Sequence, residues 1–502
     1  MSDEVKKTAS LARNWISFLG LTIAVIAAIN IAFLVLADIG SEHVNPYVGV
    51  MAYVLVPGVM VFGLLVFLAG VLIERRRRRR HAPDDIPRYP AIDLNNPKTR
   101  RIFMVTAIAL TVFVMVSIVG SYKAYHYTDS DAFCGTMCHQ IMHPQYTAYS
   151  ASPHARVGCV NCHIGSGATW FVKSKLSGAY QVYATVAEKY PKPIPTPVEN
   201  LRPAQQTCEQ CHWPEKFWGA QLKVFNHFGY DETNTPRETR LLIKTGGGSP
   251  SGGLTAGIHW HMNISNEITY VASDRQRQNI EWVRMRDRST GRTVEYTMEG
   301  ATMTAEQIAA APKRLMDCVD CHNRPAHIYE PPDRAVDMLL LGNRINRTLP
   351  FIKQQAVATM TKEYESTDQA VRTIAEDINR YYQESYPEIY QTRKNEIDRA
   401  VIELQSSFKT TRFPEMKVDW RTHPNNVGHF YSPGCFRCHT DQHKSADGKV
   451  ITKDCQICHS VIGQAEAGVV MVEVPTNEFQ HPIDLGDMRE MTCTECHTGA
   501  SM

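Results

Sequence analysis

Three long uncharged stretches dominate the hydrophobic pattern of the first quarter of the chain. They cover about residues 14–37, 48–73 and 102–122. Each is long enough to cross a hydrocarbon layer of about 30 Å as a helix. Soluble domains rarely contain three such runs, so buried core helices are the weaker interpretation. The pattern predicts a membrane region over residues 1–124 with three transmembrane helices.

The loops between these stretches differ in charge. Residues 74–101 hold ten Lys or Arg, including the run Arg75–Arg80, against four acids, whereas residues 38–50 hold no Lys or Arg. Positive loops stay in the cytoplasm, so the Arg run and the N-terminus are predicted to be cytoplasmic. The third helix then leaves the membrane on the opposite side. A cleaved signal peptide is disfavoured, because the first apolar stretch is too long and no A-x-A site follows it.

Shorter periodic segments follow the membrane region. Apolar residues recur with helical spacing over 371–381 and again over 397–408, which predicts a helical pair inside a linker at 333–413. Residues 280–286 and 293–298 flank a Thr-Gly turn and predict a β-hairpin. This hairpin belongs to a predicted insertion at about 220–310. Residues 414–502 are expected to form a compact, loop-rich module.

Composition narrows the class of protein. The 502-residue chain has a formal net charge of +2, which argues against a nucleic-acid binder of the ordinary basic type. Its mean hydropathy is −0.28, which excludes a chain that spans the membrane throughout. Fourteen cysteines are too many for an ordinary cytosolic enzyme, so their spacing becomes the main clue.

The cysteines form seven pairs, and a histidine directly follows the second cysteine of every pair. Six pairs have two intervening residues and the first has three. C-x-x-C-H is the attachment signal of c-type haem, in which the two thiols bind the haem edge and the histidine becomes an axial iron ligand. Zinc ribbons and disulfides need no histidine after each pair. The seven motifs are Cys134/Cys138/His139, Cys159/Cys162/His163, Cys208/Cys211/His212, Cys318/Cys321/His322, Cys435/Cys438/His439, Cys455/Cys458/His459 and Cys493/Cys496/His497.

Seven haems would change the fold expected for this chain. Haem faces would provide much of the buried apolar surface, so the domain can stay polar. The predicted fold is a mainly α multihaem cytochrome c with three N-terminal transmembrane helices, a small β insertion and a loop-rich, haem-packed periplasmic domain. Haem attachment occurs outside the bacterial cytoplasmic membrane, which agrees with the orientation from loop charge. We therefore expect an inner-membrane protein with a cytoplasmic N-terminus.

Several segments resemble the NapC/NirT family of membrane-anchored multihaem quinol dehydrogenases. The third apolar stretch runs directly into YHYTDSDAFCGTMCHQIMHP, an S-x-H precedes the second motif, and WFVKSK follows it. The fourth motif, CVDCHNRPAH, also matches. The resemblance covers about residues 100–215 and 310–332 and implies a tetrahaem domain at 125–332. Seven motifs behind three spans are also similar to the inner-membrane heptahaem cytochromes of metal-respiring bacteria.

The resemblance implies a site for menaquinol beside the first haem. The lysine of the family's quinol site falls on Lys175 or Lys173. The acid that follows this lysine in some members has no match here, and Glu188 is the nearest downstream acid. Both lysines could instead contact lipid headgroups at the membrane surface.

Distal iron ligands are expected among the eleven histidines that lie after residue 124 and outside the seven motifs. This large number of histidines favours bis-histidine coordination. The resemblance favours His154 and His327, and for the first haem Met142, with Met137 and His143 as competitors. A histidine only a few residues beyond its own motif cannot reach the opposite face of that iron, so His327 and His443 should bind neighbouring haems. The other candidates are His261 or His259, His423, His429 and His481.

The leading hypothesis is a menaquinol dehydrogenase that passes electrons through seven haems to periplasmic cytochromes c, in anaerobic respiration or extracellular electron transfer. The expected partners are membrane lipid, the menaquinone pool and those cytochromes, with an oligomer possible and no nucleic acid. One alternative is a terminal multihaem reductase of a small nitrogen oxyanion, which the absence of C-x-x-C-K disfavours. Another is a non-enzymatic electron-transfer anchor. The direction of electron flow stays open.

Overall fold

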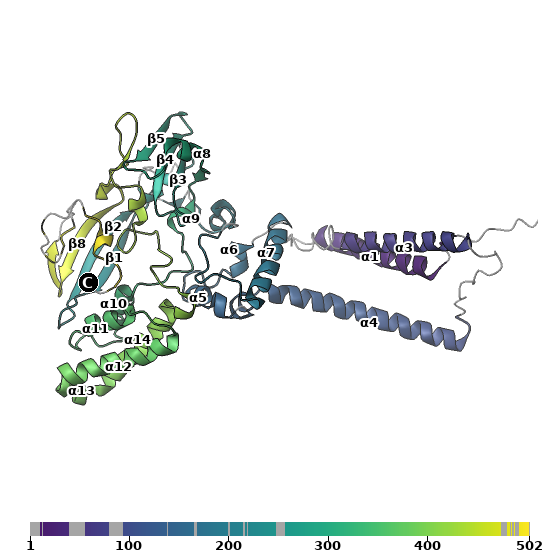
Figure 1. The fold of residues 1–502 in the computed structure, drawn as a ribbon, viewed down its shortest axis with the longest axis horizontal. Coiled ribbons are helices and arrows are strands. Elements are labelled where there is room, and N and C mark those ends of the chain that lie inside the picture. Colours follow the sequence, from purple (N-terminus) through teal and green to yellow (C-terminus); the bar gives the residue numbers. More distant parts are fainter. Residues whose placement is uncertain are drawn as a thin grey trace, which may run out of the picture. The chain divides into compact units, whose positions relative to one another are not determined.

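The computed structural model, drawn in Figure 1, consists of two compact units. One unit comprises Met1–Asp129 and Ile164–Tyr180, and the other comprises Ser130–His163 and Gln181–Met502. For some helical residues, among them Met137, His139 and Lys175, only the backbone is described. The described residues are 11–12, 14–39, 56–79, 94–137, 139–164, 168–198, 201–213, 216–217, 219–246, 257–472, 479–481, 483, 486 and 491–500.

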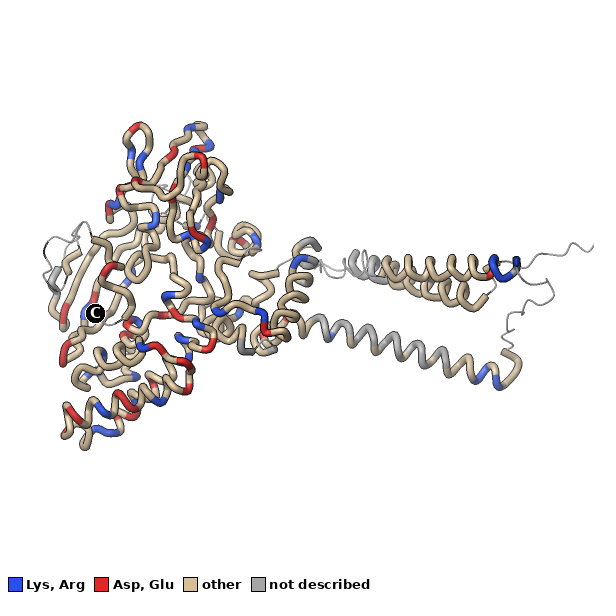
Figure 2. The backbone as a smooth tube through the Cα atoms, viewed as in Figure 1, with Lys and Arg blue, Asp and Glu red and all other residues tan. Residues whose placement is uncertain are grey.

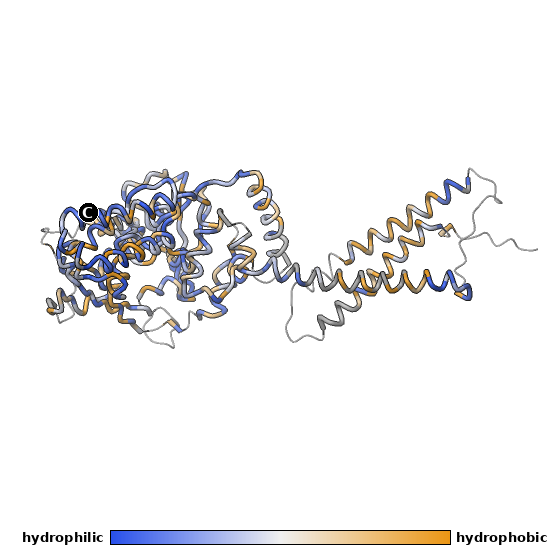
Figure 3. Tube along the Cα trace, turned by 90° about the horizontal axis from the view of Figure 1, so that it is seen from below, coloured by the Kyte–Doolittle hydropathy of each residue, from blue (hydrophilic) through white to orange (hydrophobic). Residues whose placement is uncertain are grey.

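The first unit contains long apolar helices. They are α1 (Trp15–Ile39), α3 (Val56–Arg78) and α4 (Pro97–Thr128). Figure 2 shows α1 and α3 almost free of charge until the basic end of α3, and Figure 3 shows their hydrophobic character. Within the described residues, Trp15–Ala32 and Val56–Arg77 are long and apolar enough to cross a membrane.

The structure therefore yields two candidate membrane spans where the sequence predicts three. The third predicted stretch, residues 102–122, lies inside α4, a continuous helix of 32 residues. Charged residues border this stretch on both sides, with Arg100 and Arg101 before it and Lys123 after it. Many of the α4 side chains in this stretch lie outside the described residues, so the count of two applies to the described residues alone.

Helices α1 and α3 pack antiparallel through small residues. The Ser17 hydroxyl donates a hydrogen bond to the Phe67 carbonyl at 3.1 Å, and the Asn14 amide donates to the Gly70 carbonyl at 3.1 Å. Gly20 faces the backbone of Gly63 and Phe67 so closely that a Cβ atom would collide with both. Small residues at such a contact allow the close backbone approach on which helix pairs in membranes rely.

The second unit contains two antiparallel sheets. The four-stranded sheet has the order β1-β2-β8-β9 and the five-stranded sheet has the order β6-β3-β4-β5-β7. The strands are β1 (Ala220–Phe228), β2 (Pro236–Lys244), β3 (Asn266–Ala272), β4 (Ile280–Asp287), β5 (Thr293–Met298), β6 (Arg314–Leu315), β7 (His443–Lys444), β8 (His459–Glu466) and β9 (Val469–Val472). The predicted hairpin is confirmed as β4–β5, with Trp282 opposite Thr297.

These sheets correct the predicted fold class, because the chain is mixed α/β rather than mainly α with a small β insertion. Strand β8 follows directly from the sixth motif and pairs with β2 of the insertion, so that His459 lies opposite Ile243. Strand β7 likewise adds to β5. This pairing joins the last part of the chain to the insertion. No local sequence pattern predicts it, because β6 and β7 are only two residues long.

The main apolar core lies among the helices that follow the fourth motif. The side chains of Ile374, Ile378, Leu404 and Phe408 are completely buried, which confirms the predicted helical pair. Ser366 begins the first helix of this pair by accepting a hydrogen bond from the Gln369 amide, as an N-cap does. The helices are α10 (Pro332–Leu341), α11 (Ile352–Thr361), α12 (Thr367–Ser385), α13 (Pro387–Thr392) and α14 (Lys394–Thr411).

Candidate haem-binding sites

Most of the cysteine motifs occupy a single helical turn. The second and fourth motifs lie on short α turns, α6 (Cys159–His163) and α9 (Cys318–Cys321). The others with two intervening residues lie on 3₁₀ turns at η5 (Cys208–Gln210), η10 (Gly434–Arg437), η11 (Cys455–Ile457) and η12 (Cys493–Glu495). In a helical turn, side chains three or four residues apart share one face. The two thiols and the following imidazole can therefore meet one haem edge and its iron.

The first motif, with three intervening residues, begins in a different kind of turn. Its first cysteine, Cys134, lies in a π-helical turn at Phe133–Met137. A π turn accommodates one residue more than an α turn, which matches the extra residue in this motif. Cys138 lies outside the described residues. His139 begins the next helix, α5 (His139–Ser150), and only its backbone is described.

Cys211 is the second cysteine of the third motif. Cys211 is exposed and lies just outside η5, at its C-terminal cap. The reason is local, because the chain runs along the protein surface from Gln210 to Trp213. The Cys211 amide still donates a hydrogen bond to the Cys208 carbonyl at 3.1 Å, which keeps the two cysteines on one turn. The role of Cys211 in haem attachment therefore stays a prediction.

Exposure of a motif cysteine is not peculiar to the third motif. Among the described cysteines, the first cysteine of the sixth motif and the second cysteine of three further motifs are exposed as well. An exposed thiol is accessible for attachment, but its position alone does not identify what it binds. The turn geometry and the adjacent histidines therefore indicate haem attachment more strongly than the burial of the thiols does. These further exposed cysteines are Cys162, Cys321, Cys455 and Cys496.

Acidic residues fix the turns that carry the motifs. Asp317 caps the fourth motif by accepting a hydrogen bond from the Val319 amide at 3.0 Å. The buried Asp320, inside the same motif, accepts hydrogen bonds from the Tyr270 hydroxyl at 2.7 Å and from Arg314 Nε at 2.6 Å. These contacts tie the motif to the five-stranded sheet. The acid in C-x-D-C-H thus has a structural role that spacing alone does not reveal.

Six motif histidines each face a second histidine from elsewhere in the chain. The ring centres lie 5.9 to 6.4 Å apart. A metal–imidazole bond of about 2.0 Å and a further step of about 1.2 Å to the ring centre, counted on both sides, give a span of about 6.4 Å. The spacing therefore fits an iron between each pair of rings. The pairs are His163–His327, His212–His154, His322–His259, His439–His261, His459–His429 and His497–His481.

Hydrogen bonds orient most of the opposing rings for metal binding. In five of them Nδ1 lies 2.7 to 3.1 Å from a backbone carbonyl, which can accept a hydrogen bond from the ring when the ring proton is on Nδ1. The Nε2 lone pair is then free for a metal, and a carbonyl partner of this kind is typical of ligating histidines. The carbonyl partners are Pro325 for His154, Thr245 for His259, Ile258 for His261, Gln145 for His327 and Ile483 for His481.

Burial also keeps these imidazoles neutral, as metal binding requires. Desolvation lowers the pKa of His163, His261 and His322 below the ordinary histidine value. It lowers the pKa of His327 to about 4. A neutral ring presents a lone pair without first losing a proton, so the facing pairs combine suitable distance, orientation and protonation.

Two predicted distal ligands, His423 and His443, have no ring contact with a motif histidine among the described residues. The Nε2 atom of His443 lies 2.9 Å from the Ile280 carbonyl and donates to it. This hydrogen bond uses the nitrogen that a haem ligand normally presents, and it disfavours iron binding by His443. In contrast, His259 faces His322, although the I-H-W-H segment suggested it only as an alternative to His261. Both histidines of the I-H-W-H segment thus face a motif histidine.

Of the residues predicted around the first haem, Met142, the two lysines and Glu188 lie on two helices or just beyond the second one. Met142 is half-buried on α5. Lys173 and Lys175 lie on α7 (Ala168–Val186), where the Lys173 ammonium is exposed and 5.0 Å from the Trp170 ring centre. Glu188 is exposed just beyond α7, with a left-handed backbone (φ 53°).

Neighbouring motifs of the C-terminal half contact one another in chain order. Arg437, inside the fifth motif, donates a hydrogen bond to the Asp320 carbonyl of the fourth motif at 2.7 Å. Phe436, also in the fifth motif, stacks on His429 with ring centres 4.2 Å apart. Cys493 Sγ of the seventh motif lies 3.9 Å from Nδ1 of the same His429. His429, which faces His459 of the sixth motif, thus lies between three consecutive motifs.

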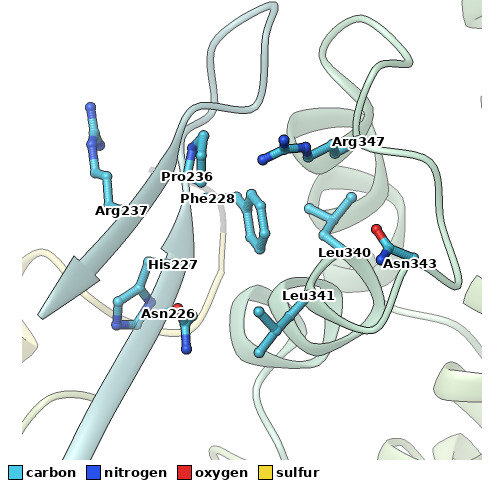
Figure 4. Close-up of a pocket in the computed structure, with 9 residues that line it drawn as sticks. All are labelled: Asn226, His227, Phe228, Pro236, Arg237, Leu340, Leu341, Asn343 and Arg347. Atoms are coloured by element: carbon cyan, nitrogen blue, oxygen red, sulfur yellow. The ribbon is translucent and has the colours of Figure 1, made fainter. Parts of the chain in front are cut away.

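One acidic cluster outside the motifs also has the composition of a metal site. Ligand atoms of His227, Asp333 and Asp337 lie within 4.8 Å of one another. The ammonium of buried Lys353 is 2.7 Å from both carboxylates, so this side chain already supplies the positive charge. A pocket of about 300 Å³ adjoins the cluster, and Figure 4 shows His227 on its wall with Phe228 and Leu340.

Comparison with known proteins agrees with these sites. Residues 96–194 match the N-terminal region of the NapC/NirT cytochrome c family, and residues 429–502 match cytochrome c3. The chain is 43% identical over 500 residues to the cytochrome c-type protein ImcH of Geobacter sulfurreducens, covering 99% of this chain and 97% of that protein. The chain belongs to the NapC/NirT cytochrome c family. As a family member it is a membrane-associated multihaem c-type cytochrome of electron transport. No solved structure matches it.

Proposed function

We propose that the protein oxidises menaquinol at the bacterial inner membrane and delivers the electrons to periplasmic cytochromes. The observation that carries this proposal is the set of six facing histidine pairs, each spaced for one iron. Two strong-field imidazoles leave no open position for a substrate on an iron, which favours electron transfer over reduction of a small molecule. When bound, the haems supply one-electron redox chemistry. Six such sites with the first motif make seven haems.

The facing pairs also give a proposed ligand set. His154, His259, His261, His327, His429 and His481 are proposed to hold the distal faces of the six irons. The ligand of the first haem stays open between Met142, Met137 and His143. The two histidines of the I-H-W-H segment would bind neighbouring haems from one 3₁₀ turn, η8 (Ile258–Met262), and so fix the spacing of the fourth and fifth motifs.

The membrane arrangement in this proposal has three spans. The apolar centre of α4 would be the third span and would lead directly into the first motif. The Arg run that begins at the end of α3 would then be cytoplasmic, and every cysteine motif would be periplasmic. Close packing between α1 and α3 supports a helical hairpin in the membrane, since both contact faces carry small residues.

Quinol binding is proposed along α7, where Lys175 or Lys173 would hold a quinol oxygen. Lysine ammonium groups can donate hydrogen bonds to this oxygen, and their stems can lie along apolar surface. Glu188 is the candidate for receiving a proton. The same residues would serve a reverse flow from periplasmic donors to quinone.

Haem reduction by a menaquinol analogue in detergent tests the function directly. When the unmodified protein is mixed with the quinol analogue, the absorption bands of reduced haem should appear. Lys175→Ala, or failing that Lys173→Ala, should slow the reduction while haem content and reduction by dithionite are unchanged. Lys192→Ala is the matched control, because Lys192 is an exposed lysine beyond α7 that lies against Tyr190. A protein that is reduced by dithionite but never by quinol would be an electron-transfer anchor instead.

A further inference from the structure

Three side chains form a buried polar cluster beside the fourth motif. Arg324, Tyr329 and His423 retain only 8%, 4% and 3% of their surface exposed. The Arg324 guanidinium lies 5.1 Å from the centre of the Tyr329 ring, and the His423 ring lies 6.0 Å from the same ring. The three groups therefore adjoin one another, and none of them belongs to the facing pairs described above.

Each of these side chains has a polar atom that finds no hydrogen-bond partner among the described residues. The atoms are Nη2 of Arg324, the hydroxyl of Tyr329 and Nε2 of His423. Their other polar atoms are held in place. Arg324 Nε donates to the His327 carbonyl at 2.9 Å, and His423 Nδ1 lies 3.1 Å from the Thr196 hydroxyl. All three unsatisfied atoms can act as hydrogen-bond donors.

The cluster also carries a buried positive charge without a counter-ion. No described acidic side chain forms an ion pair with Arg324, although its side chain is buried. Buried Lys353, by contrast, is compensated by Asp333 and Asp337. An uncompensated buried charge is strongly destabilising. Three neighbouring donors with one positive charge are therefore suited to an anion that brings its own negative charge.

The surroundings identify the anion. Arg324 lies two residues beyond His322, and its Nε bond reaches the carbonyl of His327, whose ring faces His163 at 6.3 Å. The segment after His423 is fixed to the same place, because the Asn323 amide donates to the Pro424 carbonyl at 2.9 Å. The cluster is thus adjacent to the second and fourth haem-binding sites, and every c-type haem carries two propionate carboxylates.

We propose that Arg324, Tyr329 and His423 form a carboxylate-binding pocket that holds a propionate of one of these two haems. A bound carboxylate would accept hydrogen bonds from all three donors and neutralise the guanidinium. A second source of the same chemistry is a free oxyanion from solution, such as formate or nitrite. The inference concerns haem binding and does not depend on quinol oxidation, so dithionite and electrochemical mediators suffice to test it.

The test is a redox titration of the full-length protein in detergent, with haem counted by intact mass. Arg324→Gln should keep seven haems but shift the midpoint potential of one haem downward, because an uncompensated propionate disfavours the added electron. Arg324→Lys should restore part of this shift. Arg334→Gln is the matched control: Arg334 is paired with Glu330 at 3.3 Å, and its loss should move no potential. Unchanged potentials in Arg324→Gln would overturn the proposal.

An infrared experiment keeps the proposal testable if Arg324→Gln fails to fold. Haem propionates are labelled with ¹³C, and the redox-induced difference spectrum then identifies their carboxylate bands. Tyr329→Phe removes a single hydroxyl and should shift one labelled band, whereas unaltered labelled bands would refute propionate binding. Added formate or nitrite should leave the haem spectrum of the unmodified protein unchanged. A saturable spectral change that Tyr329→Phe abolishes would assign the pocket to a free oxyanion and likewise overturn the proposal.

Discussion

The strongest prediction concerns two histidines that are separated by a single residue in the sequence. His259 faces His322 with ring centres 6.4 Å apart, and His261 faces His439 with ring centres 5.9 Å apart. Replacement of each by methionine should therefore alter a different haem. Either change would exchange the proposed bis-histidine coordination for histidine–methionine coordination at one iron and leave the other haems as they were.

The expected size of the effect follows from the exchange of one axial ligand. Methionine stabilises the reduced iron relative to histidine and raises the potential. A rise on the order of 100 mV is expected, which corresponds to about 2 kcal/mol because 59 mV is tenfold for one electron. The geometry permits the exchange. The iron would lie at the midpoint of each pair, about 3 Å from each ring centre, and the thioether of a methionine can reach a similar distance from its backbone to the iron. The Thr245 carbonyl loses its Nδ1 partner in His259→Met, so a small loss of stability should accompany the shift.

Electron paramagnetic resonance and potentiometry together provide the assay. Each variant should lose one bis-histidine signal and gain one high-potential haem, with haem content unchanged. A background that lacks Cys435 and Cys438 assigns the haem: His261→Met should have no further effect there, whereas His259→Met should still create the new signal. If both substitutions altered the same haem, or if neither changed the spectra, the proposed pairing would be refuted.

Three further predictions concern packing, charge and the order of the motifs. Gly63→Leu should separate α1 from α3 and reduce membrane incorporation, because a Cβ atom there would lie 2.7 Å from a backbone nitrogen, whereas Gly58→Leu should be tolerated because nothing lies within 4 Å. Lys353→Met should cost about 3–5 kcal/mol in chemical unfolding, since it leaves two buried carboxylates unpaired, and a cost under about 1 kcal/mol would contradict the ion-pair role. Joint replacement of Cys493 and Cys496 by alanine should remove one haem by mass and abolish electron delivery to an external cytochrome, while quinol still reduces the remaining haems. Unimpaired delivery would show that the seventh motif is not the terminal site.

Local patterns in the sequence predict those parts of the protein whose determinants are contiguous. The helical pair follows from apolar residues at helical spacing, and the hairpin from two strands around a Thr-Gly turn, because each pattern specifies its own backbone. The mixed α/β architecture could not be predicted in this way. Its two-residue strands form only when distant segments meet, and β8 gains its partner from an insertion far back in the chain.

The sequence by itself determined the class of this protein, since each motif of the C-x-x-C-H type places its two cysteines and the histidine within a few residues, as multihaem c-type cytochromes do. Only the tertiary structure decided which second histidine faces each of six motif histidines, because the partners come from distant segments brought together by folding. His259 and His443 illustrate the difference. In the sequence, both are histidines outside the motifs and equally candidates for distal ligands. In the structure, Nδ1 of His259 lies beside a backbone carbonyl and Nε2 can bind a metal, whereas His443 donates its Nε2 proton to a carbonyl. Hydrogen-bond direction depends on where the backbone of another segment lies, and no local pattern contains that information.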